Sequence, residues 1–68
     1  MMRDLTIFCA QEPDDVLRAK VKPGISGPEV VINFDSVSDG APTPAMIALD
    51  KQRARELFNW LGIWLHKY

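Results

Sequence analysis

Hydrophobic and polar residues alternate over much of the first 36 positions, with the period of a half-buried β-strand. In residues 16–22, VLRAKVK, apolar and basic side chains point to opposite faces. Residues 4–10, DLTIFCA, and 29–35, EVVINFD, have the same period and are rich in β-formers. The pattern predicts three strands whose inward face carries Leu5, Ile7, Cys9, Leu17, Ala19, Val21, Val30, Ile32 and Phe34.

Clusters of proline, glycine and aspartate separate the predicted strands. QEPDD follows the first strand, and PGISGP lies between the second and the third, so both connections are short. SVSDGAPTP makes a longer connection after the third strand. Because sequential strands joined by short turns tend to be neighbours, we expect an antiparallel meander.

From Lys51 onward the apolar period is that of a helix, and Asp50 is the expected N-cap. Residues 45–49 fit a short fourth strand or an early helical turn, and the two prolines just before them favour the strand. The expected fold is one α+β domain over residues 1–68. It consists of a three- or four-stranded antiparallel β-meander packed against one C-terminal α-helix.

The predicted helix carries more apolar side chains than one face needs. At about 100° per residue, two of them leave the main stripe: Trp60 falls at its edge and Ile63 falls on the opposite side. Single exposed apolar residues are normal, but tryptophan is enriched at binding hot spots. Trp60 and Ile63, with Phe8 on the outer sheet face, are therefore the candidate protein interface. The stripe expected to cover the sheet contains Ala54, Leu57, Phe58, Leu61, Trp64, Leu65 and Tyr68.

The outer face of the predicted sheet also carries a basic row made of Arg18, Lys20 and Lys22. Lysines in such places commonly keep a sheet solvated and protect its edges. The row also fits a docking face for a protein or for a phosphate backbone, with Phe8 as a platform on which a base stacks. Nucleic-acid binding is thus the alternative function. A net charge of −1 and the acids at positions 14, 15 and 35 argue against it.

The length of 68 residues is near the lower limit for a domain that folds alone. Disulfides, metals or partner subunits commonly stabilise such chains. Cys9 is the single cysteine, and one Cys with one His is too few for a four-ligand zinc site. We therefore expect a homo-oligomer in the reducing cytoplasm. No apolar run reaches the roughly 18 residues typical of a membrane span.

No catalytic or cofactor motif is apparent in the sequence. No serine or cysteine lies near His66 in the sequence; Cys9 could pair with it only across the fold, and Cys9 is more typical of a small buried hydrophobe. Residues 35–40, DSVSDG, resemble the start of a calcium loop. Such a loop would have Val37 in its third place and Met46 in its twelfth, where oxygen ligands are needed. Residues 24–27, GISG, join two predicted strands, whereas the glycine loop of a KH domain joins helices. We expect no enzymatic activity and no cofactor.

The C-terminal segment PAMIALDKQRARELFNWLGIWLHKY resembles the ends of short proteins encoded by phages and prophages. Those ends have a strand, a capping residue and a helix of the form A-x-x-L-x-x-W-L, here Asp50 followed by Ala54, Leu57, Trp60 and Leu61. The resemblance implies a phage accessory protein or an anti-CRISPR-like inhibitor of host defence that acts by binding. Together with the residue patterns, it predicts a small non-catalytic protein–protein interaction module.

Overall fold

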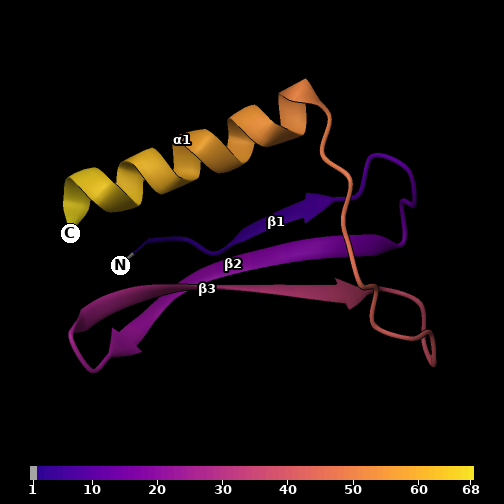
Figure 1. Ribbon diagram of the computed structural model, residues 1–68, viewed down its shortest axis with the longest axis horizontal. Coiled ribbons are helices and arrows are strands. Elements are labelled where there is room, and N and C mark those ends of the chain that lie inside the picture. The colour runs from indigo at the N-terminus through magenta and orange to yellow at the C-terminus, as the bar shows by residue number, and fades with distance from the viewer. Residues whose placement is uncertain (1) are drawn as a thin grey trace.

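Three strands and one helix make up the fold (Figure 1). The structure, a computed structural model, describes residues 2–68. The elements are β1 (Leu5–Phe8), β2 (Asp15–Gly24), β3 (Gly27–Ser36) and α1 (Lys51–Lys67). Strand β2 pairs antiparallel with both of its neighbours, giving the sheet order β1-β2-β3. The predicted α+β meander with a C-terminal helix is confirmed.

The hairpin between β2 and β3 turns through Ile25 and Ser26. Among the described residues, only glycines have positive φ, so both turn residues keep negative φ angles. Gly27 follows with φ of 122°, a conformation that a residue with a Cβ atom adopts only with strain. This requirement explains the glycine at the first position of β3.

The strand register places apolar side chains in rows across one face of the sheet, here called the inner face. Side chains of paired residues in antiparallel strands point to the same side. The inward residues predicted within the three strands therefore share this face. Two rows are Ile7–Leu17–Phe34 and Leu5–Ala19–Ile32.

Helix α1 lies along the β1 side of the sheet, and β3 is the strand farthest from it (Figure 1). The fully buried core is centred on Trp60, which packs with Ile7, Leu17 and Ala19. Because the helix backbone approaches β1 alone among the three strands, the core lies toward one side of the sheet. Partly buried residues around it are Met2, Leu5, Val21, Val30, Ile47, Leu49, Leu57 and Leu61.

Residues 45–49 form neither a strand nor a helical turn. They pass just beyond the end of β1, where the Ala10 N–H donates to the Ala48 carbonyl at 2.8 Å. The preference for a fourth strand is wrong, because β1 has already ended at Phe8 where the segment meets it. Ile47 and Leu49 instead contribute to the core as packing side chains.

Hydrogen bonds between loops stabilise the end of the sheet near Val16. Val16 is on the outer face, paired with Phe8 and Asp35, and it is completely buried. The Val37 N–H donates to the Asp14 carbonyl at 2.8 Å. The Ser38 hydroxyl donates to the Asp14 carboxylate at 2.9 Å. These bonds join the β1–β2 loop to the segment after β3, at the opposite end of β3 from the hairpin turn.

Candidate interaction surface

Trp60 is the one buried side chain that α1 contributes. It is 8% exposed, and its indole Nε1–H donates to the Arg3 carbonyl at 2.8 Å. The expectation that Trp60 lies off the core stripe is wrong. Apolar side chains cover a wider sector of the helix than the sheet can contact. Trp60 lies within the contacted part, where its indole N–H has an acceptor. Trp60 is therefore core and not contact surface.

The buried face of α1 is rotated away from the predicted stripe. Arg53, Leu57 and Trp64 are half-buried on the same side as Trp60, and Leu61 is half-buried at the edge. The rest of the stripe is exposed instead, and it consists of Ala54, Phe58, Leu65 and Tyr68. Phe58 and Leu65 are 73% and 70% exposed, so this flank of the helix presents large apolar side chains to solvent.

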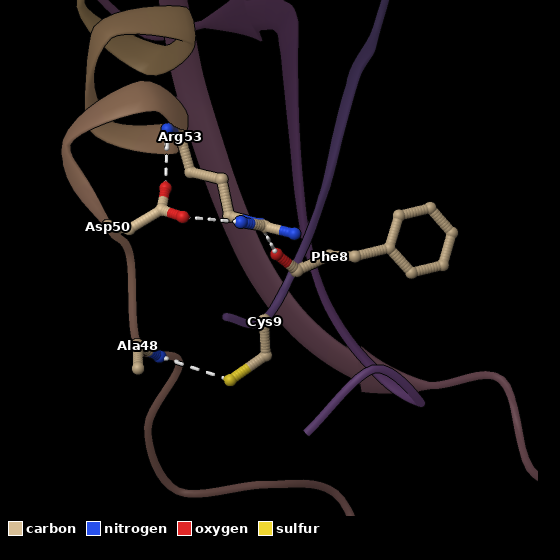
Figure 2. Close-up of polar contacts among 5 residues, drawn as sticks. All are labelled: Phe8, Cys9, Ala48, Asp50 and Arg53. Carbon is tan, nitrogen blue, oxygen red and sulfur yellow. Dashed lines mark hydrogen bonds and ion pairs between the residues drawn. The ribbon is translucent and has the colours of Figure 1, made fainter. Parts of the chain in front are cut away.

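A polar cluster fixes the start of the helix over the end of β1 (Figure 2). Asp50 is the N-cap, as predicted, and its carboxylate accepts from the Arg53 backbone N–H at 2.9 Å. The Arg53 guanidinium donates to the other Asp50 oxygen at 2.6 Å and to the Phe8 carbonyl at 2.7 Å. Arg53 thus ties the first helical turn to the last residue of β1.

The protonation of Asp50 is coupled to this cluster. The Arg53 backbone N–H, and secondarily the Arg53 guanidinium, hold the pKa of Asp50 below its ordinary value of 3.8. Both interactions favour the charged carboxylate. The helix cap is therefore formed with ionised Asp50, and acid weakens it.

Exposure of the inner face rises from β1 and β2 toward β3. In the row Ile7–Leu17–Phe34, the exposed fraction is 2%, 5% and 36%. In the neighbouring row, Ala19 is buried and Ile32 is 45% exposed. These residues have the same apolar character and the same orientation. The difference arises because α1 covers the β1 side of the face and leaves the β3 side uncovered.

The exposed flank of α1 is on the side of the helix that faces the uncovered strand. Tyr68, at the end of this flank, lines a hollow of about 330 Å³ with the β2–β3 hairpin residues Val21, Lys22, Pro23, Gly24, Gly27 and Pro28. The other flank of the helix, with Gln52 and Glu56, lines a hollow with β1. We call the four exposed apolar residues on the β3 side of the molecule, Ile32 and Phe34 of the strand and Phe58 and Leu65 of the helix, the open apolar face.

Ile63 and Phe8, the other two candidate contact residues, lie on different parts of the surface. Ile63 is exposed and lines a hollow on the helix with Phe58, Asn59, Gly62 and His66, so this hollow borders the open apolar face at Phe58. The Phe8 ring points away from the polar cluster at the helix start (Figure 2). The structure does not bring Ile63, Phe8 and Trp60 together, because Trp60 is buried in the core while Ile63 and Phe8 are exposed on different elements.

The predicted basic row is exposed on the outer face, where Arg18, Lys20 and Lys22 project from β2. Acidic residues of β3 lie beside it. Arg18 Nε is 3.8 Å from an Asp35 carboxylate oxygen, and Lys22 is opposite Glu29 in the register. Neighbouring carboxylates reduce the attraction of such a row for phosphates. The electrostatic support for nucleic-acid binding is accordingly weak.

Cys9 lies near the segment that precedes the helix, whereas His66 lies at the C-terminal end of the helix. The buried Cys9 follows β1, and its sulfur accepts from the Ala48 N–H at 3.3 Å (Figure 2). Backbone N–H groups of Glu12, Ala48 and Gln11 lower the pKa of the thiol from its ordinary 9.0. His66 is in the last turn of α1, about 24 Å along the helix from the cap. The structure therefore does not assemble a Cys–His pair.

Comparison with protein-family models, with curated proteins and with solved structures gave no match. The likeness of the C-terminal segment to phage-encoded proteins stays a prediction. Among residues 2–68, no group of three or more His, Cys, Asp or Glu residues is placed to hold a metal ion. In the same part of the chain, α1 is neither long nor apolar enough to cross a membrane.

Proposed function

We propose that this chain is a small non-catalytic protein–protein interaction module that self-associates. The setting implied by the C-terminal resemblance is a phage accessory protein or a host-defence inhibitor that acts by binding. The open apolar face supports the proposal, since large exposed apolar patches commonly mark interaction sites. Single exposed apolar residues would not support it, but here both β3 and α1 contribute exposed apolar side chains.

The accessible surface area of the chain is the observation that most supports self-association. A compact monomer of 7.7 kDa is expected to expose about 4,300 Å². This chain exposes 5208 Å², which is about 900 Å² more than that expectation. A standard protein–protein interface buries about 800 Å² on each partner. The excess is therefore the amount of surface that one such interface removes from water.

The shape of the chain leads to the same conclusion. A compact domain of 68 residues has an expected radius of gyration of about 11 Å. The value here is 12.9 Å, and the principal extents are 34, 26 and 17 Å. The molecule is flat and wide because the helix lies beside the centre of the sheet rather than over it. A partner that covers the β3 side would make the assembly more compact.

Light scattering across a range of protein concentrations tests this proposal. We expect a molar mass that rises from 7.7 kDa toward twice that value or more as the concentration increases. A molar mass that stays at 7.7 kDa up to millimolar concentration would contradict self-association. A parallel titration with single- and double-stranded DNA or RNA at low salt tests the alternative, which requires binding that weakens steeply with salt.

A further inference from the structure

We propose that a second copy of this chain closes the open apolar face. Each copy lays the Phe58–Leu65 flank of its helix on the uncovered strip of β3, Ile32 and Phe34, of the other copy. The inference rests on the proposed self-association and specifies its geometry. The contact is reciprocal, so a single two-fold axis relates the copies and the interface closes as a dimer.

The helix flank has the spacing that a helix in an apolar groove uses. Phe58 and Leu65 are at positions i and i+7, with the half-buried Leu61 at i+3 beside them, and these positions fall along one side of a helix. Recognition of amphipathic helices by hydrophobic grooves uses anchors at this spacing. Within one chain, Phe58 and Leu65 remain largely exposed, so the flank is not consumed by the intramolecular core.

The uncovered strip is wide enough for a second helix. Adjacent strands lie about 4.8 Å apart, so β3 is about 9.6 Å from β1 across the sheet. Packed helices have axes about 8–10 Å apart. A helix of the second copy placed over β3 would therefore lie at normal packing distance from the helix that covers β1. The sheet of each copy would then carry two helices on its inner face.

The area and the symmetry agree with this arrangement. The surplus surface of about 900 Å² per chain matches one standard interface, and the reciprocal contact uses both halves of the open apolar face at once. A helix–helix contact through Phe58 and Leu65 alone would leave Ile32 and Phe34 exposed in both copies. A contact between β3 edges alone would leave the helix flank exposed. The reciprocal contact is the one that covers both.

A charge-exchange experiment tests the pairing of helix with strand. The two variants are Leu65→Lys and Ile32→Glu, both at exposed positions. Each alone places two unpaired charges in the reciprocal interface, one at each contact, and we expect its dimer dissociation constant to rise at least about 100-fold. In an equimolar mixture, the introduced lysine of one copy meets the introduced glutamate of the other, while the second contact keeps its wild-type residues. We expect the mixture to recover dimers that contain one copy of each variant.

Controls separate this inference from self-association itself. Ile63→Lys changes an exposed apolar residue of the same helix that shares a hollow with Phe58 but is not among the four proposed contact residues, and we expect it to weaken the dimer far less than Leu65→Lys does. Circular dichroism checks that each variant is folded, and Phe34→Glu replaces Ile32→Glu if the latter does not fold. Mass measurement by light scattering or native mass spectrometry reports the assembly.

Three outcomes overturn the inference in different ways. A monomeric wild type removes both the self-association and the specified dimer. A dimeric wild type that Leu65→Lys or Ile32→Glu leaves intact keeps self-association and removes this geometry, and disruption by Ile63→Lys would then assign the contact to the other side of the helix. Monomeric single variants that fail to recover a mixed dimer exclude the pairing of helix with β3.

Discussion

The β1 and β3 sides of the inner face are built from the same kind of residue, yet only one is covered. Ile7 on β1 is buried beneath α1, whereas Phe34 in the same cross-strand row is partly exposed. The alternation of apolar residues in β3 is as regular as that in β2. A row of apolar residues in the sequence therefore predicts a face that must be covered, but it does not identify the molecule that covers it.

The two sides also differ in how the helix is held. On the β1 side, Trp60 fills the core and its N–H bonds to the Arg3 carbonyl, while Arg53 ties the helix start to Phe8. On the β3 side, Tyr68 reaches a shallow hollow beside the hairpin. Specific bonds thus select the β1 side for the single helix that the chain has.

The largest predicted effect comes from truncating the covered side. Trp60→Ala should lower the free energy of unfolding by about 3–5 kcal/mol, because it removes the centre of the core. For a domain of this size, that is most of the stability. The matched change on the uncovered side, Phe58→Ala, should alter the monomer by less than about 0.5 kcal/mol.

Urea denaturation followed by circular dichroism, at a concentration where the chain is monomeric, measures both variants. Equal losses of stability in Trp60→Ala and Phe58→Ala would contradict the distinction between the two sides.

A second pair of variants isolates the hydrogen bond of Trp60. Trp60→Phe should destabilise the fold by at least about 1 kcal/mol, because the bond to the Arg3 carbonyl is lost and the smaller ring leaves a cavity. Trp64 is the control, since its buried Nε1 has no hydrogen-bond partner within residues 2–68. Trp64→Phe should therefore be better tolerated in thermal unfolding. The reverse order of stabilities would show that Arg3 is not the acceptor that matters.

The helix start provides a smaller, pH-dependent effect. The pKa of Asp50 is below 3.8 in the folded chain, so its charged cap stabilises the fold fully above pH 3.8. This contribution is lost as the pH falls through the lower folded pKa. Asp50→Asn keeps a capping side chain but does not titrate.

We expect the difference in melting temperature between wild type and Asp50→Asn to be constant above pH 5 and to shrink below pH 3.8. A difference that stays constant down to pH 2 would show that Asp50 is not coupled to the cap.

The smallest predicted effect is a stabilisation on the exposed side of the helix. A Cβ atom added at Gly62 would meet no other group within 4 Å, so the glycine is not needed for close packing. Gly62→Ala should raise the free energy of unfolding of the monomer by about 0.5–1 kcal/mol through helix propensity. A loss of stability in chemical denaturation would indicate that Gly62 has a packing role.

Much of the architecture could be predicted from the sequence. Alternation identified the three strands, and the change of period at Lys51 with Asp50 before it identified the helix and its cap. These features depend on neighbouring residues only, so they can be recognised in a single sequence. The strand at 45–49 was wrong because pairing depends on where β1 ends, which is a tertiary property.

The orientation of the helix could be predicted only in part. Its apolar sector is broad, and a helical wheel gives no reason to choose the side of Trp60 over the side of Phe58 and Leu65. Two interactions with distant residues decide it, the Trp60 bond to Arg3 and the Arg53 bond to Phe8. Neither has a signal in the local pattern. The open apolar face cannot be predicted from the sequence for the same reason, because the local pattern places its residues in the core.

Isotope-filtered NMR on a mixture of labelled and unlabelled protein is the sharpest test of the reciprocal contact between the helix flank and β3. Such spectra detect only contacts between different copies of the chain. We predict intermolecular contacts from the methyl groups of Leu65 to the ring of Phe34 and to the side chain of Ile32. Intermolecular contacts confined to Ile63, or contacts that connect β3 only with β3, would contradict the account.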